Sequence, residues 1–238
     1  MGRHMVIAGK KAKEDQRRGK IFGKLSKKIS VAARQGGDLE YNSELATIVD
    51  EAKAMNMPKD NIERAIKKGS GELEGVEYLD LMYEGYGPSG VAVLIEVLTD
   101  NKNRAVAEMR HAFDKYGGNL GESGCVSFMF DHKGILVIKN SDSIDDDEIM
   151  MEAIEAGAED IDIDDAFIEI DTTVNGFGDV KNKFKADGYD FEMAELRYVP
   201  QNMVALTKAE DVENMEKMIE VLEDNDDVQK VYHNWDIE

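Results

Sequence analysis

Apolar residues recur at helical spacing along the first third of the chain. Between residues 17 and 34 they fall three or four positions apart, with lysines on a neighbouring stripe, and this pattern predicts an amphipathic basic helix. A second helix is indicated by a cap at Asn42 or Ser43, and a third by Pro58 in its first turn. The glycine-rich stretch 69–75 then changes the composition of the chain, and we interpret it as a linker.

Beyond this linker the period of the pattern changes to two. Residues 79–84 and 91–98 have the alternation of strands, residues 103–116 that of a helix, and residues 125–130 that of a third strand. Residues 135–198 then predict the order βαββαβ, which is a complete ferredoxin-like unit.

The final strand, helix and strand, between residues 203 and 233, are too few to fold alone. They would complete the ββαβ set that begins at residue 79, which makes the middle domain discontinuous. We therefore expect an α+β protein of three domains: an N-terminal three-helix domain and two ferredoxin-like α+β domains, the last inserted into the middle one. The expected bounds are 1–75 for the helical domain with its linker, 76–132 and 203–238 for the middle domain, and 133–202 for the inserted domain.

Charge is sorted along the chain. The whole chain has a formal net charge of −21, yet residues 1–37 hold eleven Lys and Arg against Glu14 and Asp15. Clustered cations of this kind attract a polyanion, so we expect the basic end to bind nucleic acid. The acidic remainder would repel the same partner. The predicted nucleic-acid-binding residues are Lys10, Lys11, Lys13, Arg17, Arg18, Lys20, Lys24, Lys27, Lys28 and Arg34.

Composition argues against several other classes of protein. No run approaches the roughly 20 apolar residues of a membrane span. The apolar run near the start of the chain is too short for a secretory signal. We therefore expect a cytoplasmic protein with no membrane partner. Cys125 is the only cysteine, which excludes an internal disulfide and a cysteine-based zinc site. It is expected to be a small buried hydrophobe, with a reactive thiol as the alternative.

No residue pattern points to catalysis. The four histidines lack ligand spacing, no Ser, His and Asp constellation is visible, and the acidic runs 145–148 and 159–165 lack the register of a calcium loop. We interpret the first run as a helix N-terminus and the second as a half-buried edge strand. We therefore expect no enzyme activity, cofactor, metal or small-molecule substrate.

The run Gly85-Tyr86-Gly87-Pro88-Ser89-Gly90 matches the dinucleotide fingerprint in letters only. Such a site needs a helix immediately after the glycines, whereas here a strand is predicted. Two interpretations remain: the glycines permit a tight connection, or Tyr86 lies exposed on the loop and stacks on a base or a partner. A second glycine-rich stretch, 117–124, is expected to be a helix cap and a long turn.

The helix predicted between these two stretches carries several cations. They could form a second contact zone, or they could be ion-pair partners of Glu108 and Asp114. The candidate partner-contact residues are Tyr86, Lys102, Arg104 and Arg110.

Five motifs stand in order along the chain, at residues 17–22, 57–69, 83–90, 98–104 and 117–121. Together they resemble the YebC/PmpR family. The resemblance implies a three-domain, non-enzymatic protein of a family described as DNA-binding transcriptional regulators. Members such as the mitochondrial translational activator of cytochrome c oxidase I are linked instead to translation on the ribosome. The usual Gly-His-Ser-Lys-Trp segment is absent, and His4 falls about where the tryptophan would be.

The sequence leaves the nucleic acid open, because DNA and ribosomal RNA share the phosphate charge that a basic face attracts. A transcriptional regulator is expected to have a helix-turn-helix pair and usually a symmetric dimer, neither of which the turn residues indicate. A ribosome-associated translation factor binding ribosomal RNA would suit a monomer with several contact surfaces. We take the DNA-binding regulator as the first hypothesis and the translation factor as the alternative.

Overall fold

The computed structural model describes residues 3–141 and 144–237, with side chains from Arg18 onward. The chain divides into two compact units. The first contains the residues up to Ser127 and those from Val204 onward, and the second contains residues 128–203. The second unit is thus inserted into the first, as the predicted fold class requires.

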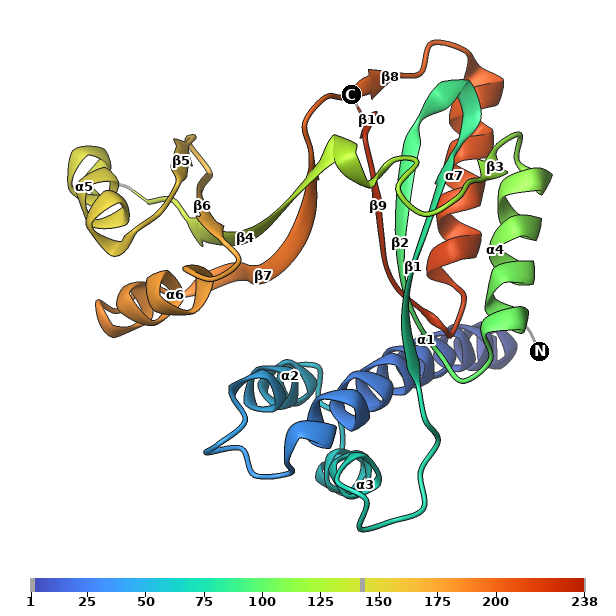
Figure 1. Ribbon diagram of the computed structural model, residues 1–238, viewed down its shortest axis with the longest axis horizontal. Coiled ribbons are helices and arrows are strands. Elements are labelled where there is room, and N and C mark those ends of the chain that lie inside the picture. The colour runs from blue at the N-terminus through green and yellow to red at the C-terminus, as the bar shows by residue number, and fades with distance from the viewer. Residues whose placement is uncertain (1–2, 142–143, 238) are drawn as a thin grey trace. The chain divides into compact units, whose positions relative to one another are not determined.

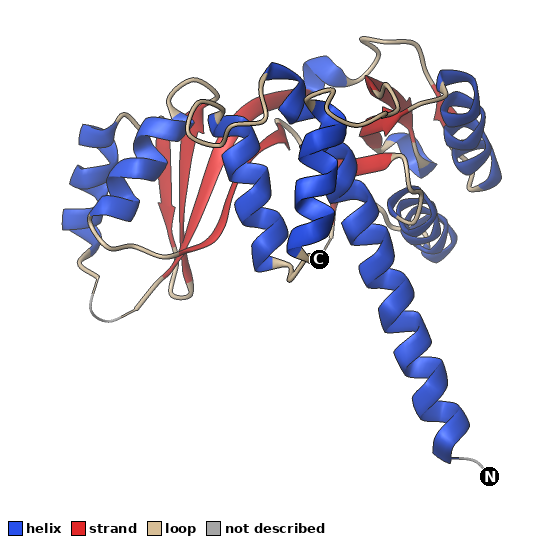
Figure 2. Cartoon of the chain, turned by 90° about the horizontal axis from the view of Figure 1, so that it is seen from below, coloured by secondary structure: helices blue, strands red, loops and turns tan. Residues whose placement is uncertain are grey.

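The first unit begins with one long helix, α1 (Arg3–Ala32), which Figure 2 shows running to the end marked N. The predicted start of this helix at Arg17 is wrong, because the helix begins at Arg3. The prediction followed the apolar stripe, which weakens before Arg17. Residues 3–16 are mostly strong helix formers and include no proline, so the helix continues without that stripe.

Three helices share one apolar core, formed by residues such as Leu25, Ile29, Val49 and Ile62. Asn42 caps the second helix, as predicted, and accepts a hydrogen bond from the Leu45 N–H at 3.0 Å. Its side-chain amide donates to the carbonyls of Ala32 and Gly36, so this buried residue ties the end of α1 to the start of α2. The elements are η1 (Ala33–Gln35), α2 (Ser43–Ala54) and α3 (Lys59–Gly69).

A four-stranded sheet in the order β3-β1-β2-β9 forms the rest of the first unit. Helices α4 and α7 pack on one face of it, over a core that includes Val93, Ile95, Met109, Phe113 and Met218 (Figure 1). Strand β9 comes from the far end of the chain and pairs with β2. The elements are β1 (Leu79–Tyr86), η2 (Pro88–Gly90), β2 (Ala92–Thr99), α4 (Lys102–Lys115), β3 (Asn119–Leu120), β8 (Val204–Ala205), α7 (Ala209–Glu223), β9 (Val228–His233) and β10 (Trp235–Asp236).

The strand predicted over residues 125–130 is wrong. The buried Glu84 carboxylate accepts hydrogen bonds from the backbone N–H groups of Gly124, Val126 and Ser127 at 2.8, 2.9 and 2.8 Å. These donors are therefore unavailable for a sheet ladder, and the chain forms the short 3₁₀ turn η3 (Ser127–Met129) instead. Burial raises the pKa of Glu84, but the three backbone donors outweigh it and leave the pKa below its ordinary value.

The two glycine-rich stretches pack against each other. Gly85 pairs with Leu120, and Tyr86 with Asn119, in the short ladder between β1 and β3. A Cβ atom on Gly85 would lie 2.6 Å from the Asn119 carbonyl oxygen, and one on Gly118 would lie 2.5 Å from that of Tyr86. The glycines therefore permit a close backbone approach, and a strand follows the first stretch, as predicted.

The second unit is the predicted βαββαβ unit. Its four strands are antiparallel throughout in the order β5-β6-β4-β7, and helices α5 and α6 share a core with them (Figure 1). Strand β4 begins at Phe130, so the expected boundary between residues 132 and 133 falls inside a strand. Asp145 caps α5, and β5 is a half-buried edge strand, as the acidic runs predicted. The elements are β4 (Phe130–Lys139), α5 (Asp146–Ala156), β5 (Asp160–Ile163), β6 (Phe167–Thr173), α6 (Phe177–Ala186) and β7 (Phe191–Pro200).

Replacing Glu84 with glutamine should destabilise the protein by about 1–3 kcal/mol, because the amide NH₂ would face a backbone N–H donor in a buried site. Urea unfolding of Glu84→Gln against Glu77→Gln, at an exposed position, measures the difference. Equal stability of the two variants would show that the loop does not depend on the Glu84 carboxylate.

Candidate nucleic-acid interface

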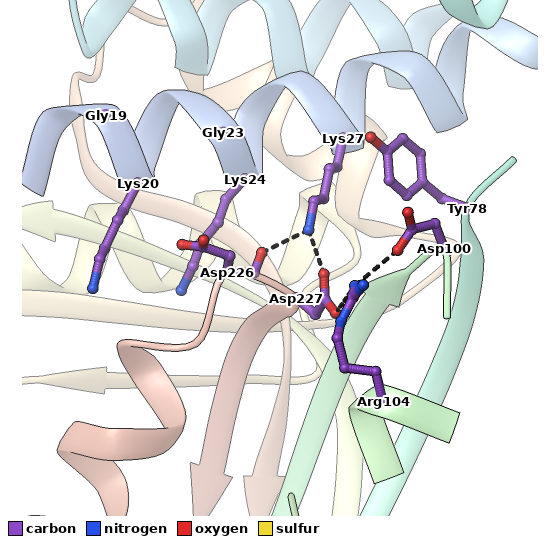
Figure 3. A pocket seen from close by; sticks show the side chains of 10 residues that line it. All are labelled: Gly19, Lys20, Gly23, Lys24, Lys27, Tyr78, Asp100, Arg104, Asp226 and Asp227. Carbon is purple, nitrogen blue, oxygen red and sulfur yellow. Dashed lines mark hydrogen bonds and ion pairs between the residues drawn. The ribbon is translucent and has the colours of Figure 1, made fainter. Parts of the chain in front are cut away.

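Three of the lysines predicted to bind nucleic acid point from α1 toward the turn between α7 and β9 (Figure 3). Lys20 Nζ lies 2.6 Å from Asp224 Oδ1, and Lys24 Nζ donates to the Glu223 carbonyl at 2.7 Å. Lys27 Nζ donates to the Asp226 carbonyl at 2.8 Å and to Asp227 Oδ1 at 2.6 Å. We call residues 223–227 the acidic turn.

The acidic turn is well suited to hold these ammonium groups. The last carbonyls of a helix lack partners within the helix and form the negative end of its dipole. Lys20 also donates to the carbonyl of Asp224, the residue that follows the last turn of α7. The lysines thus bind both the carboxylates and the exposed carbonyls at this end of α7.

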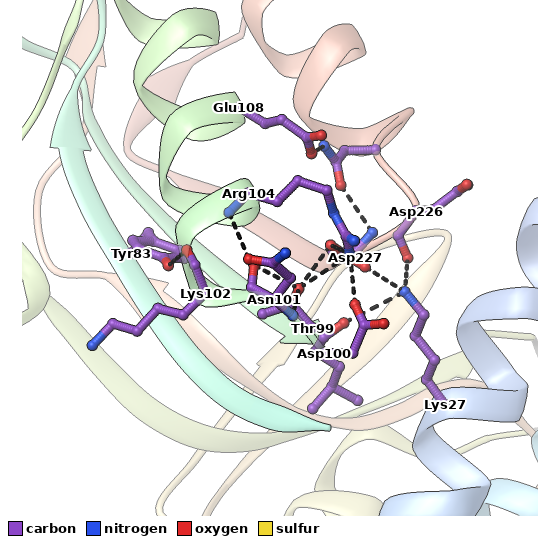
Figure 4. A network of polar contacts seen from close by, with 12 residues as sticks. Lys27, Tyr83, Thr99, Asp100, Asn101, Lys102, Arg104, Glu108, Asp226 and Asp227 are labelled. Carbon is purple, nitrogen blue, oxygen red and sulfur yellow. Dashed lines mark hydrogen bonds and ion pairs between the residues drawn. The ribbon is translucent and has the colours of Figure 1, made fainter. Parts of the chain in front are cut away.

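Asp227 is the most buried member of this contact, with 4% of its surface exposed. Its second carboxylate oxygen accepts hydrogen bonds from Arg104 Nη2 at 2.7 Å and from Thr99 Oγ1 at 2.8 Å (Figure 4). Arg104 Nη2 also binds Asp100 Oδ1 at 2.8 Å. A single carboxylate therefore joins α1, β2 and α4.

These contacts shift the ionisation of both partners. Burial raises the pKa of Asp227, but hydrogen bonds from Arg104, Lys27 and Thr99 outweigh it and hold the pKa below its ordinary value. Hydrogen bonds to Asp227 and Asp100 raise the pKa of Arg104. Burial lowers the pKa of Lys24, although the carboxylates of the acidic turn raise it.

An open cleft of about 650 Å³ lies between α1 and the acidic turn. On its α1 side, the lining positions are Gly19, Lys20, Gly23, Lys24 and Lys27. The rest of the lining comprises Tyr78 and four charged residues, Asp100, Arg104, Asp226 and Asp227. The cleft is therefore a polar junction and not an apolar ligand pocket.

The other predicted cations differ in their surroundings. Lys28 Nζ lies 3.8 Å from Glu51 Oε2, and Nη2 of the exposed Arg34 donates to the Tyr78 carbonyl oxygen at 2.9 Å. Arg18 is exposed and has a polar or charged contact. The side chains of Lys10, Lys11, Lys13 and Arg17 lie outside the described part of the structure.

A second group of cations, on α3, is absent from the predicted set. Arg64, Lys67 and Lys68 are exposed, and among the residues that the structure describes they form no ion pair. Arg64 and Lys68 line a groove of about 280 Å³ between α1 and α3, together with Asn61 and Ser26. Lysines are common in the last turn of a helix, so the sequence alone does not distinguish Lys67 and Lys68 from ordinary helix-end residues.

The candidate partner-contact residues are spread over the sheet and α4. Tyr86 is not on an exposed loop: it is the last residue of β1, it is half-buried, and its hydroxyl donates to the Cys125 carbonyl at 2.9 Å. Arg104 pairs with Asp100 and Asp227, whereas Glu108 accepts a hydrogen bond from Asn225. Arg104 is thus an ion-pair partner, as one of the two interpretations expected, but its partners are Asp100 and Asp227 and not Glu108 or Asp114. Lys102 and Arg110 are exposed on α4.

Other chemistry finds little support in the described residues. Burial raises the pKa of the Cys125 thiol, and the nearby Glu84 carboxylate adds to this, which disfavours a reactive thiolate. Among the side chains that the structure describes, residues 18–141 and 144–237, no group of three or more His, Cys, Asp or Glu is arranged to hold a metal ion. None of the helices described in these ranges has the length and apolar character needed to cross a bilayer.

Removing the Asp227 side chain should destabilise the first unit by about 3 kcal/mol, because Lys27 and Arg104 lose a buried partner. The pKa of Asp227 is lower in the folded protein than in the unfolded chain, where it is about 4. The stabilisation is therefore fully present above pH ~4, and it disappears as the pH falls through the pKa of Asp227 in the folded protein. Denaturant unfolding of Asp227→Ala at neutral and acidic pH measures both effects.

The matched control is Asp226→Ala, one residue earlier on the same turn and exposed. Lys27 binds the backbone carbonyl of Asp226, so this variant should unfold like the parent. Similar losses in the two variants would contradict the central role of Asp227.

Comparison with known proteins gives one consistent result along the chain. Residues 3–72 match the family model of the TACO1/YebC protein N-terminal domain, and residues 78–235 match that of the TACO1/YebC second and third domain. A probable transcriptional regulatory protein of Finegoldia magna is 51% identical over 233 residues, covering 98% of this chain and 96% of the relative. One from Clostridioides difficile is 49% identical over 239 residues, covering all of both chains.

A solved structure supports the same conclusion. The crystal structure of a conserved hypothetical protein from Aquifex aeolicus superposes with a TM-score of 0.82 at 42% sequence identity, covering 93% of this chain and 91% of that one. Both family models and the full-length relatives agree with the five sequence motifs. The chain belongs to the TACO1/YebC family, that is, the YebC/PmpR family of probable transcriptional regulatory proteins.

Proposed function

We propose that this protein is a non-enzymatic, cytoplasmic regulator of gene expression that binds duplex DNA through α3 and the α1–α3 groove. The observation that carries the proposal is the group of three exposed α3 cations, Arg64, Lys67 and Lys68, which form no ion pair with a described residue. The names of the bacterial relatives support a role in regulation, and a regulator of transcription acts where the chromosome lies.

The connection between α2 and α3 supports DNA as the ligand. Four residues join the helices, and among them Asn56 adopts a left-handed conformation with φ of 58°, while Met57 is buried in the three-helix core. A short turn with a residue suited to positive φ, joining two helices that share a core, is typical of helix-turn-helix units. In such units the second helix enters the major groove.

The outer face of α3 carries the residue types that such a role requires. Asn61, Arg64 and Lys68 recur along one side of the helix, and Lys67 adjoins them. Arginine and asparagine can form paired hydrogen bonds with base edges, and lysine binds phosphate. In contrast to Lys20 and Lys27, the cations Arg64, Lys67 and Lys68 need not leave a described carboxylate partner before binding DNA.

The second unit is poorly suited to hold the same ligand. On the ladder between β5 and β6, Asp160 faces Asp171, and Asp162 faces Glu169. Acids directly opposite each other repel, and burial together with Asp171 raises the pKa of Glu169. This sheet face would repel a phosphate backbone, which favours binding by the helical domain.

The predicted cations nearest the start of the chain stay in the proposal. Helix α1, which forms one wall of the groove, also contains Lys10, Lys11, Lys13 and Arg17, and we keep these as predicted phosphate contacts. Neither Tyr86 nor the cations of α4 is needed for this proposal. Ribosomal RNA remains the alternative ligand, because it offers the same phosphate charge.

The test replaces Lys67 and Lys68 with glutamine and measures binding to duplex DNA and to a ribosomal RNA fragment at several salt concentrations. The variant should bind more weakly, and the slope of log affinity against log salt should fall by about one for each phosphate that it no longer binds. The control is Lys139→Gln/Lys185→Gln, which removes the same charge from exposed positions of the second unit.

Equal losses in the test and control variants would contradict a binding role for α3. Parent protein that binds neither nucleic acid would contradict the function as a whole. Tight binding to the RNA fragment with no binding to DNA would favour the translation factor.

A further inference from the structure

The acidic turn occupies the lysines that the sequence marks for a polyanion. Lys20 binds a carboxylate oxygen and the backbone carbonyl of Asp224, and Lys24 binds the backbone carbonyl of Glu223. The charged Asp224 oxygen, 2.6 Å from the Lys20 ammonium group, is the kind of acceptor that a nucleic-acid phosphate would offer. The turn therefore imitates, in position and charge, the ligand expected for this stripe.

The contacts of the stripe differ in strength along α1. Lys27 binds the buried Asp227, whose side chain is 6% exposed, while the Asp224 side chain that binds Lys20 is 68% exposed. Exposed ion pairs contribute little and are screened by salt, whereas a buried and fully bonded carboxylate is costly to leave. The exposed ion pair of Lys20 and the single carbonyl contact of Lys24 can consequently be exchanged while Lys27 remains bound.

The apolar cores do not oppose such an exchange. The core of the three helices contains residues between 21 and 66, and the core under α4 and α7 begins at Leu81, so the two share no residue. Residues 71–77, which connect the helices to β1, are exposed and include Gly71 with φ of 85°. Release of Lys20 and Lys24 from the acidic turn would therefore break polar contacts and leave both cores intact.

We propose that Lys20 and Lys24 form a second phosphate-binding surface, which the acidic turn covers in the free protein and a nucleic-acid backbone uncovers by competition. This inference rests on the proposed binding of nucleic acid by α3. DNA held at α3 would raise the local concentration of phosphate beside α1. Because the turn competes with phosphate for these lysines, it lowers their affinity for any polyanion. A ligand that also binds α3 overcomes this competition, whereas a polyanion that binds only at α1 does not.

The experiment removes charge from the acidic turn and leaves the lysines in place. Asp224→Asn/Asp226→Asn weakens the competitor, while Asp227 and its buried contacts stay intact. The control is Glu216→Gln/Glu220→Gln, which removes two charges from exposed positions of the same helix, where the described residues offer these side chains no ion pair. Both variants reduce the overall repulsion of DNA equally, so a difference between them reports on the turn.

The turn variant should bind the duplex at least about threefold more tightly than the control at low salt. If the uncovered lysines bind phosphates, its salt dependence should steepen by about one for each additional phosphate bound. Affinities and slopes equal to those of the control would overturn the proposal.

A second measurement follows the lysines directly. In the free parent, acetylation of Lys20 and Lys24 should be slower than that of the exposed Lys67 and Lys68. In the turn variant Lys20 and Lys24 should react faster, and adding duplex DNA should protect them. Equal reactivity in parent and variant, or no protection by DNA, would also overturn the proposal.

The two proposals fail in different ways. If binding survives removal of Lys67 and Lys68, the assignment of α3 is wrong. If that removal abolishes binding but the turn variant matches its control, α3 stands and only the covered surface is excluded.

Discussion

The buried carboxylate of Asp227 is the contact on which the arrangement of the first unit depends. It accepts hydrogen bonds from Lys27 of α1, Arg104 of α4 and Thr99 of β2, which lie 123 to 200 residues from Asp227 in the sequence. The two apolar cores share no residue. This polar contact therefore holds α1 against β2 and α4, a role that a shared apolar core has in other proteins. It fixes where the basic helix lies relative to the acidic end of α7.

This constraint changes the meaning of the charge asymmetry. A segment with eleven cations suggests a surface open to nucleic acid. In the folded chain, Lys20, Lys24 and Lys27 are bound to the acidic turn, whereas Arg64, Lys67 and Lys68 of α3 form no ion pair with a described residue. The helical domain thus divides its positive charge between an internal contact and an exposed face. The internal contact holds the basic helix α1 against the acidic turn, while the exposed face leaves cations available to a partner.

Local patterns in the sequence were sufficient for most of the fold. Alternation and turn residues predicted the βαββαβ unit, its insertion into the first unit, and the cap at Asn42. The strand predicted at 125–130 was wrong because a side chain 40 or more residues away uses its backbone donors. Likewise, the partner of Lys24 lies 199 residues along the chain, so no local signal could show that this lysine is occupied. The α3 cations were hidden for the opposite reason, because their local role as helix-end residues was a sufficient explanation.

The central claim is that nucleic acid contacts the outer face of α3. Photo-cross-linking of the protein to its nucleic acid in cells, followed by identification of both the attached peptide and the bound sequence, tests it most directly. The account predicts cross-links on the peptide that contains residues 59–69, and sequences drawn from DNA. Cross-links confined to the second unit, residues 128–203, would contradict it.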